Sequence, residues 1–365
     1  MPPVIFLLAC AVFAQGTSEF VLSGLLPQIA AGTGVSLGAA GLLTSLFAAG
    51  MVAGAPVLAM LGSKLPRKLA LLTFLGLFSA VHVIGALTTD FPLLLATRAL
   101  AAFANAGFLS VALAALPSLV AEDAVGRATS VLLSGVTLAC IVGVPAGTLL
   151  GQYAGWQAAF WAIAAITAAA AVALTTTKFD SPSATSPVYR EWRVLTQPRV
   201  AATVVKGILV NGGTFAAFTY LGTMTQSASW VPVVLAVFGV GSFVGVTIAG
   251  KAGPRILKAG TAVLTAVWVA AFFAAQSLPG LIAAALITGA MAFGVGSALI
   301  AAIVTSASKE APRVAGAIAT TAFNLGAVAG PAVAGAVVLD AAHASAAFWV
   351  SAAFTAAAMF LRVKK

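Results

Sequence analysis

The chain has 365 residues, of which 61% are hydrophobic and only 7% are charged. Soluble domains carry about 25% charged residues, so a water-soluble core with a polar surface is excluded. The formal net charge is +10, which in a soluble protein would favour nucleic acid as a partner. Here the basic residues lie in short segments between apolar runs, so we interpret them as signals of membrane orientation and expect no nucleic-acid partner.

Twelve apolar runs are long enough for membrane helices, each of which needs about 20 residues. The first run lacks a positively charged start and is followed by others, so we interpret it as a retained helix and not as a cleaved signal. The predicted helices, in chain order, are 4–26, 37–61, 69–89, 91–117, 128–152, 157–177, 203–222, 231–249, 259–276, 280–304, 314–338 and 345–361.

The basic residues alternate with these helices. The loops after every second helix and the C-terminal tail hold 16 of the 18 Lys and Arg residues. The two exceptions, Arg98 and Lys206, lie within predicted helices. Because basic loops stay in the cytoplasm, the sequence predicts a multi-pass membrane protein with both termini cytoplasmic.

The longest polar stretch, residues 178–199, divides the chain into two halves of six helices. Short patterns recur about 190 residues apart: KLPR at 64–67 corresponds to KAGPR at 251–255, and GVPAG at 143–147 corresponds to GP at 330–331. Such repeats are typical of transporters. We therefore expect an all-α membrane protein with two pseudo-symmetric six-helix bundles, 1–177 and 200–365, joined by a cytoplasmic linker at 178–199.

Glu19 and Arg98 are ionisable residues inside predicted helices, where charge is costly and usually functional. Both lie about seven residues from the same end of their helices, roughly 10 Å deep at 1.5 Å per residue. We expect a facing pair, which is either a static structural ion pair or a proton-coupling site in which Glu19 gains and loses a proton. His82 has no partner that the sequence suggests.

Other polar or aromatic residues within helices are candidates for a substrate-binding cavity: Phe13, Gln15, Asn105, Asn211 and Asn324. For each Asn the alternative is a hydrogen bond between helices. Gly143, Pro145 and Gly147 lie in the middle of the fifth helix, where proline removes a backbone hydrogen bond. They predict either a packing kink or a flexible contact between the halves.

Signatures of several other mechanisms are missing. The chain has no GxxxxGK[ST] motif for nucleotide binding and no HExxH motif or His/Cys cluster for a metal. We therefore expect no enzyme activity, no cofactor and no metal.

Four segments resemble bacterial proton-driven drug exporters of the major facilitator superfamily, in the chloramphenicol-resistance branch. They are 15–27 (QGTSEFVLSGLLP), 105–109 (NAGFL), 126–135 (GRATSVLLSG) and 155–161 (GWQAAFW). The resemblance places Arg98 at the family's arginine motif in the fourth helix and Gly143–Gly147 at its antiporter motif. The family's loop motif after the second helix corresponds to Lys64, Arg67 and Lys68, but Ser63 and Pro66 replace its usual Asp and Gly.

The resemblance implies a monomeric antiporter that uses protons to export small amphipathic drugs, with chloramphenicol-like antibiotics favoured as substrates. Its partners would be the substrate, protons and the lipid bilayer. Two alternatives remain open. One is an exporter of sugars or other metabolites with the same fold, and the other is a membrane sensor that transports nothing.

Overall fold

The computed structural model describes residues 1–61, 66–177, 189–225, 227–252, 256–257, 259–308, 310–311 and 314–361. The regular secondary structure in these ranges consists of helices, joined by turns and short irregular segments. Ten helices in them are long and apolar enough to cross a membrane, and α11 is a shorter apolar helix. Leucine and alanine, which favour helices, dominate these segments, and a helix satisfies every backbone hydrogen bond internally, as a spanning segment requires.

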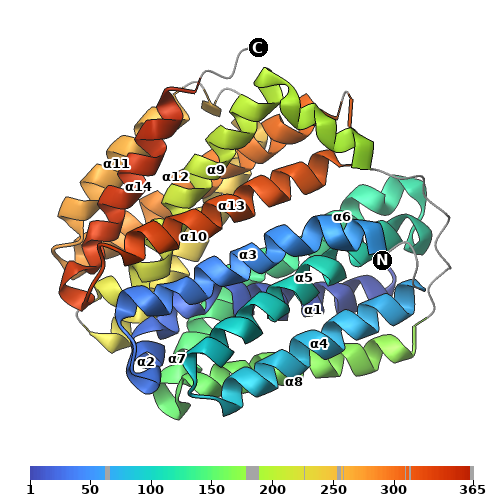
Figure 1. Ribbon diagram of the computed structural model, residues 1–365, viewed down its shortest axis with the longest axis horizontal. Coiled ribbons are helices and arrows are strands. Elements are labelled where there is room, and N and C mark those ends of the chain that lie inside the picture. Colours follow the sequence, from blue (N-terminus) through green and yellow to red (C-terminus); the bar gives the residue numbers. More distant parts are fainter. Residues whose placement is uncertain are drawn as a thin grey trace.

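The first half of the chain forms one bundle, coloured blue to green in Figure 1. Its helices are α1 (Pro3–Phe20), α2 (Leu22–Thr33), α3 (Leu37–Leu61), α4 (Arg67–Leu87), α5 (Phe91–Leu119), α6 (Val125–Leu138), α7 (Val144–Ala154) and α8 (Trp156–Thr175). A five-residue π-helix, Ala139–Gly143, joins α6 to α7. Pro145 offers no N–H at this point of the helix, and π-turns of this kind mark interrupted α-helices.

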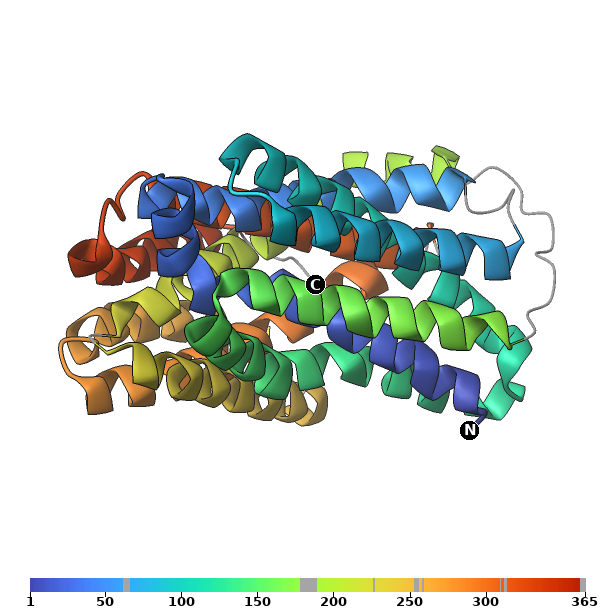
Figure 2. The same cartoon turned by 90° about the horizontal axis from the view of Figure 1, so that it is seen from below.

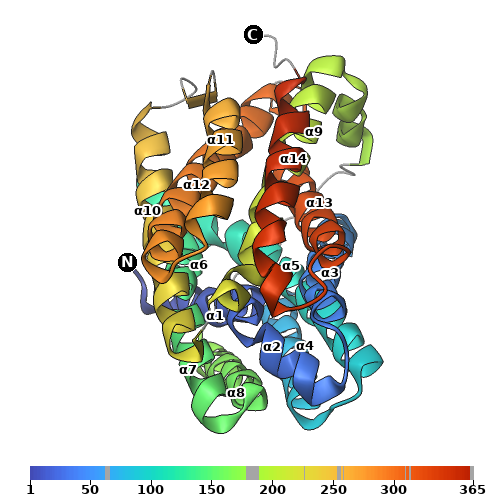
Figure 3. The same ribbon diagram turned by 90° about the vertical axis from the view of Figure 1, so that its left-hand side faces the viewer.

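The second half forms the other bundle, coloured yellow-green to red, and Figure 3 shows the two groups one above the other. Its helices are α9 (Pro198–Leu221), α10 (Val231–Ala252), α11 (Gly260–Ala274), α12 (Leu278–Ala307), α13 (Ala315–Gly335) and α14 (Ala347–Met359). A 3₁₀ helix, Tyr189–Thr196, precedes α9, and its Val194 packs with Ala315 and Ile318 of α13. Part of the predicted linker is therefore folded onto the second half, while residues 178–188 lie outside the described residues.

All twelve predicted helices have a counterpart, but the fifth is interrupted by the π-helix and the first is interrupted as well. The sequence predicts a single helix over 4–26, but α1 ends at Phe20 and α2 continues from Leu22 to Thr33. Pro27 lies inside α2 and offers no N–H to the Ser23 carbonyl. At the break itself, the Gly24 N–H donates to the Val21 carbonyl over 3.0 Å, and the Phe20 carbonyl accepts from the Ser23 hydroxyl over 2.8 Å. The first membrane helix is therefore interrupted near Val21.

The two bundles meet at one end of the molecule, on the left in Figures 1 and 2, which we call the closed end. Here Gly38 of α3 lies against Gly335 of α13, so closely that a Cβ on Gly38 would come within 2.2 Å of the Gly335 carbonyl oxygen. The hydroxyl of buried Tyr220 lies 3.5 Å from the Gly38 carbonyl and 3.4 Å from that of Pro331. Glycine without a Cβ permits this close backbone approach.

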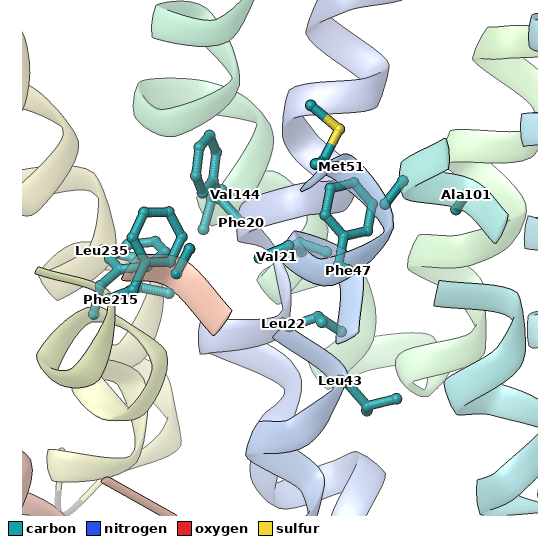
Figure 4. Close-up of a cluster of buried hydrophobic side chains, with 14 of the residues drawn as sticks. Phe20, Val21, Leu22, Leu43, Phe47, Met51, Ala101, Val144, Phe215 and Leu235 are labelled. Carbon is teal, nitrogen blue, oxygen red and sulfur yellow. The ribbon is translucent and has the colours of Figure 1, made fainter. Parts of the chain in front are cut away.

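A hydrophobic core connects the bundles further along their length. Figure 4 shows Phe20 of α1 beside Phe215 of α9, with Leu235 and Val144 nearby. The rings of Phe20 and Phe215 are 6.0 Å apart, and the ring of Phe218 lies 5.8 Å from that of Phe20, edge on. The residue that follows Glu19 is thus packed into the second half, which fixes the position of Glu19 between the bundles.

Candidate functional site

A cavity of about 230 Å³ lies where α1 faces the second bundle. From α1 come Glu19 and Phe20, and all other lining residues belong to α9, α10, α12 and α13. The wall is mainly apolar, with aromatic rings from Phe215, Phe293 and Phe323. Apolar cavities with a few polar groups are typical of small-molecule sites.

Two of the predicted binding residues, Asn211 and Asn324, line this cavity together with Glu19. The side-chain amide of Asn211 donates to the Phe323 carbonyl over 2.6 Å, so it also joins α9 to α13. The amide of Asn324 donates to the Thr320 carbonyl, one turn earlier in α13, over 3.0 Å. Each side chain keeps an amide oxygen, which is a hydrogen-bond acceptor, for another partner.

The other three predicted binding residues are not among the residues that line this cavity. Phe13 packs at the π-helix: a Cβ added to Gly143 would lie 3.2 Å from its ring. Asn105 is buried in α5. Gln15 is buried too, and both polar atoms of its side chain have no hydrogen-bond partner among the described residues. A binding role for these three residues stays a prediction.

Arg98 is 1% exposed and binds α1 through Ser18. Its Nη1 donates to the Ser18 hydroxyl over 2.7 Å, and its Nη2 donates to the Ser18 carbonyl over 2.8 Å. The guanidinium also stacks over the ring of Phe47, 4.4 Å from its centre. The hydrogen bonds described for Arg98 thus reach Ser18, the residue before Glu19, and no direct ion pair with Glu19 is among the described contacts. The two charged groups still lie close enough to interact electrostatically, so their pairing stays a prediction.

His82 is the residue that the sequence analysis missed. Its Nε2 lies 2.6 Å from the Ser18 hydroxyl, and its Nδ1 lies 2.7 Å from the Phe78 carbonyl oxygen. A depth comparison could have found it, because His82 lies just before the end of α4 and Arg98 just after the start of α5. Antiparallel neighbours at those positions share a depth in the bundle. The sequence alone suggests no partner for His82, and the structure supplies two, Ser18 and Phe78.

The predicted loop motif lies at the end opposite the closed end. Arg67 at the start of α4 donates through Nη1 to the Ser118 hydroxyl near the end of α5, over 2.9 Å. Lys68 donates to the Thr175 carbonyl at the end of α8. Lys64 lies outside the described residues. The two described basic residues therefore connect the ends of three helices within the first bundle.

The predicted conformational motif lies at a contact between the bundles. A Cβ on Gly143 would come within 2.1 Å of the Thr17 hydroxyl on α1, and a Cβ on Gly239 of α10 would come within 2.7 Å of the Cys140 carbonyl. Pro145 lies in the first turn of α7, directly after the π-helix. Gly147 packs against Val21, where a Cβ would meet that side chain at 2.7 Å. The fifth membrane helix is thus held between α1 and α10.

Comparisons with known proteins agree with this architecture. The chain is 44% identical over 348 residues to a chloramphenicol resistance protein of Streptomyces lividans, which covers 92% of this chain and 88% of that protein. It is 33% identical to the inner membrane transport protein YdhP of Escherichia coli (strain K12), covering 91% of this chain and 87% of the relative.

Solved structures show the same fold at low sequence identity. A bacterial homologue of the human lysosomal transporter Spinster, in an inward-facing and occupied conformation, matches with a TM-score of 0.78 at 16% identity, covering 99% of this chain and 97% of that one. A variant of the nucleoside transporter NupG matches with a TM-score of 0.73 at 14% identity, covering 98% of each chain.

The family model of the Major Facilitator Superfamily matches residues 8–259, which is more than half of the chain. With the two bundles and the helix order described above, this match supports the expected fold of twelve membrane helices. The chain belongs to the Major Facilitator Superfamily.

Proposed function

We propose that this protein exports small amphipathic drugs in exchange for protons. The observation that carries the proposal is the position of Glu19 in the wall of the cavity between the bundles. Among the described residues the other Asp and Glu side chains lie at helix ends or in connecting segments. Glu19 is therefore the carboxyl group that the described part of the chain offers to a substrate or a proton inside the membrane.

A carboxyl group in an apolar wall can switch between two states. Burial opposes the ionised form and a nearby positive charge favours it, so a change of surroundings as the cavity opens to either side would bind and release a proton. One charge moved through 100 mV provides about 2.3 kcal/mol. A single proton can therefore drive a neutral drug uphill.

The cavity wall favours an amphipathic substrate over a sugar. Its phenylalanine rings offer surface for an aromatic or aliphatic group, while the amides of Asn211 and Asn324 offer hydrogen bonds. A sugar needs a hydrogen-bond partner for nearly every hydroxyl, and this wall has few. The similarity to a chloramphenicol resistance protein makes chloramphenicol the natural test substrate.

The decisive experiment compares Glu19→Gln with the wild type in proteoliposomes with an imposed pH gradient. Gln keeps the shape and removes the titrating group, so we expect chloramphenicol binding to remain and gradient-driven export to fall to background. Asp90→Asn is the matched control, because Asp90 lies outside the cavity and caps α5 by accepting from the Leu93 N–H at 2.7 Å. Export by Glu19→Gln with wild-type pH dependence would disprove the proposal.

The orientation and the division into moving halves belong to the same proposal. The basic loops support cytoplasmic termini in a bacterial inner membrane, and 1–177 and 200–365 would move as two bodies around the cavity. The orientation can be tested in a variant without Cys10 and Cys140 that carries one new cysteine. The new cysteine replaces either Ser183, which lies outside the described residues, or Ser277, which lies near the closed end. An impermeant thiol reagent added outside the cells should label the second site and not the first.

A further inference from the structure

Three buried polar residues of the first bundle form one hydrogen-bonded chain beside the cavity. Ser18 of α1 is the central member: its hydroxyl is 2.7 Å from Nη1 of Arg98 and 2.6 Å from Nε2 of His82. Ser18 is fully buried and His82 is 2% exposed. The chain thus connects α1, α4 and α5 in a part of the bundle from which water is excluded.

The protons of this chain can be assigned from its ends. The Phe78 carbonyl only accepts, so Nδ1 of His82 carries the hydrogen of that 2.7 Å contact. In neutral imidazole Nε2 is then an acceptor, and the Ser18 hydroxyl donates to it. The oxygen lone pairs of Ser18 remain for the N–H of Arg98. The Ser18 hydroxyl is thereby oriented so that its oxygen faces the guanidinium.

Arg98 has an alternative partner one residue away. Glu19 follows Ser18 in α1 and lines the cavity, whereas Arg98 is bound to the hydroxyl and carbonyl of Ser18. The Nε–H of Arg98 is buried and has no partner among the described residues, and a buried donor without a partner is costly. A carboxylate that accepted from this Nε–H would therefore stabilise the guanidinium in a new position.

The other surroundings of His82 carry little charge. Its ring lies 4.3 Å from that of Phe78 and 5.6 Å from that of Phe160 on α8. Helices α8 and α3 contain no Asp, Glu, His, Lys or Arg within their bounds, α5 contributes Arg98, and α1 contributes Glu19 and Cys10. Cys140 lies on the π-helix that packs against α1. Arg98 is thus the charged group that interacts with His82, and Glu19 is the other charged group on these packed elements.

We propose that His82 is a positioning residue for proton coupling: acting through the Ser18 hydroxyl, it holds Arg98 on Ser18 and out of a direct ion pair with Glu19 while the carboxyl group lines the cavity. The inference rests on the proposed role of Glu19 in proton exchange. It assigns His82 the role of a hydrogen-bond acceptor and not that of a proton carrier. Breaking the chain should release Arg98 toward Glu19, and an opposite charge within about 4–6 Å favours the ionised carboxylate.

The test measures chloramphenicol binding to purified protein, and the protons released on binding, across a range of pH. Ser18→Ala should move the midpoint of the profile about one unit to lower pH, since one charge-assisted hydrogen bond is removed. His82→Leu should move it in the same direction, and His82→Leu added to Ser18→Ala should move it no further. His82→Gln keeps an acceptor for Ser18 and should retain the wild-type profile.

Ser79→Ala is the matched control, because it removes a helix-to-helix hydrogen bond of α4, 2.9 Å to the Ala164 carbonyl, outside the chain of three residues. Its profile should be that of the wild type. The inference is overturned if His82→Leu leaves the profile unchanged, if its shift persists in full in Ser18→Ala, or if His82→Gln shifts the profile as His82→Leu does. A wild type whose binding does not depend on pH, or keeps that dependence in Glu19→Gln, refutes the proposed function itself.

Discussion

Adding one methyl group at the closed end should shift the protein toward the state in which that end is open. In Gly38→Ala the new Cβ would lie 2.2 Å from the Gly335 carbonyl oxygen and 3.1 Å from the Val338 carbonyl oxygen. Ordinary contacts of a Cβ begin near 3.4 Å. Because both neighbours are backbone atoms, no side chain can rotate away, and α3 and α13 must separate by about 1 Å.

The cost falls on one conformation. Overpacking of this kind costs about 1–3 kcal/mol, and a gap of 0.5–1 Å forfeits roughly a quarter to a half of the dispersion energy of the contacts on either side. In the conformation in which the bundles have separated at the closed end, this contact is absent. The energetic cost therefore falls on the closed conformation alone and shifts the equilibrium between the two conformations. By the usual conversion it corresponds to about a 5- to 150-fold shift.

Distances between spin labels at Tyr153 and Leu339 provide the assay. These residues are 88% and 69% exposed and lie near the closed end on different bundles. In a variant without Cys10 and Cys140, Gly38→Ala should increase the population of long distances. The control is Gly76→Ala, because a Cβ at that helical glycine would meet nothing within 4 Å. If both variants keep the wild-type distribution, the contact of α3 with α13 does not decide which end is closed.

Two further predictions concern the cavity and the closed end. Asn324→Ala should weaken chloramphenicol binding about two- to tenfold, as loss of one hydrogen bond implies. Ser79→Ala, outside the cavity, should not weaken it. Equal effects of the two variants in calorimetry would contradict the assignment of the cavity as the binding site. The hydrogen bond from His343 to Asp340, 2.7 Å long, holds the pKa of that exposed carboxyl below its usual value. Its stabilising effect is therefore present above the ordinary pKa of Asp and is lost as pH falls through the lowered one. His343→Ala should raise the pKa of Asp340 in an infrared titration of labelled aspartate, and an unchanged value would contradict this.

Apolar length and the pattern of basic loops were sufficient to predict the membrane helices, because both depend on composition along the chain. The ninth predicted helix, 259–276, corresponds to Gly260–Ala274, and the twelfth, 345–361, to Ala347–Met359. The interruption near Val21 was not predicted, since Pro27 alone does not tell where a helix breaks. The break depends on how the Ser23 hydroxyl and carbonyl are satisfied, which is a property of the folded chain.

The candidate site was predicted only in part, because the sequence gives the type and the depth of a residue but not the direction of its side chain. Glu19, Asn211 and Asn324 stand out as polar residues in apolar helices, and they do line one cavity. Depth along a helix can be counted from the sequence, which is why Glu19 and Arg98 were expected near one level, and Arg98 does bond to Ser18, the neighbour of Glu19. The direction of a side chain around the helix depends on how the helices pack, and this is why the partnership of Arg98 with Ser18 was missed.

The placement of Ser18 and Glu19 next to each other would link the two events that the proposed proton-driven exporter must couple. Successive residues of an α-helix point about 100° apart, so Ser18 faces α4 and α5 while Glu19 faces the cavity and the second bundle. One turn of α1 therefore contacts both bundles. If α1 moves with the second bundle when the closed end opens, the bonds from Arg98 to Ser18 must break, and the nearest carboxyl group is then Glu19. If α1 stays with α4 and α5, Glu19 is separated from Phe215 and the rest of the cavity wall. In either case the surroundings of the carboxyl group change with the conformation, which is the physical requirement for coupling a proton to transport.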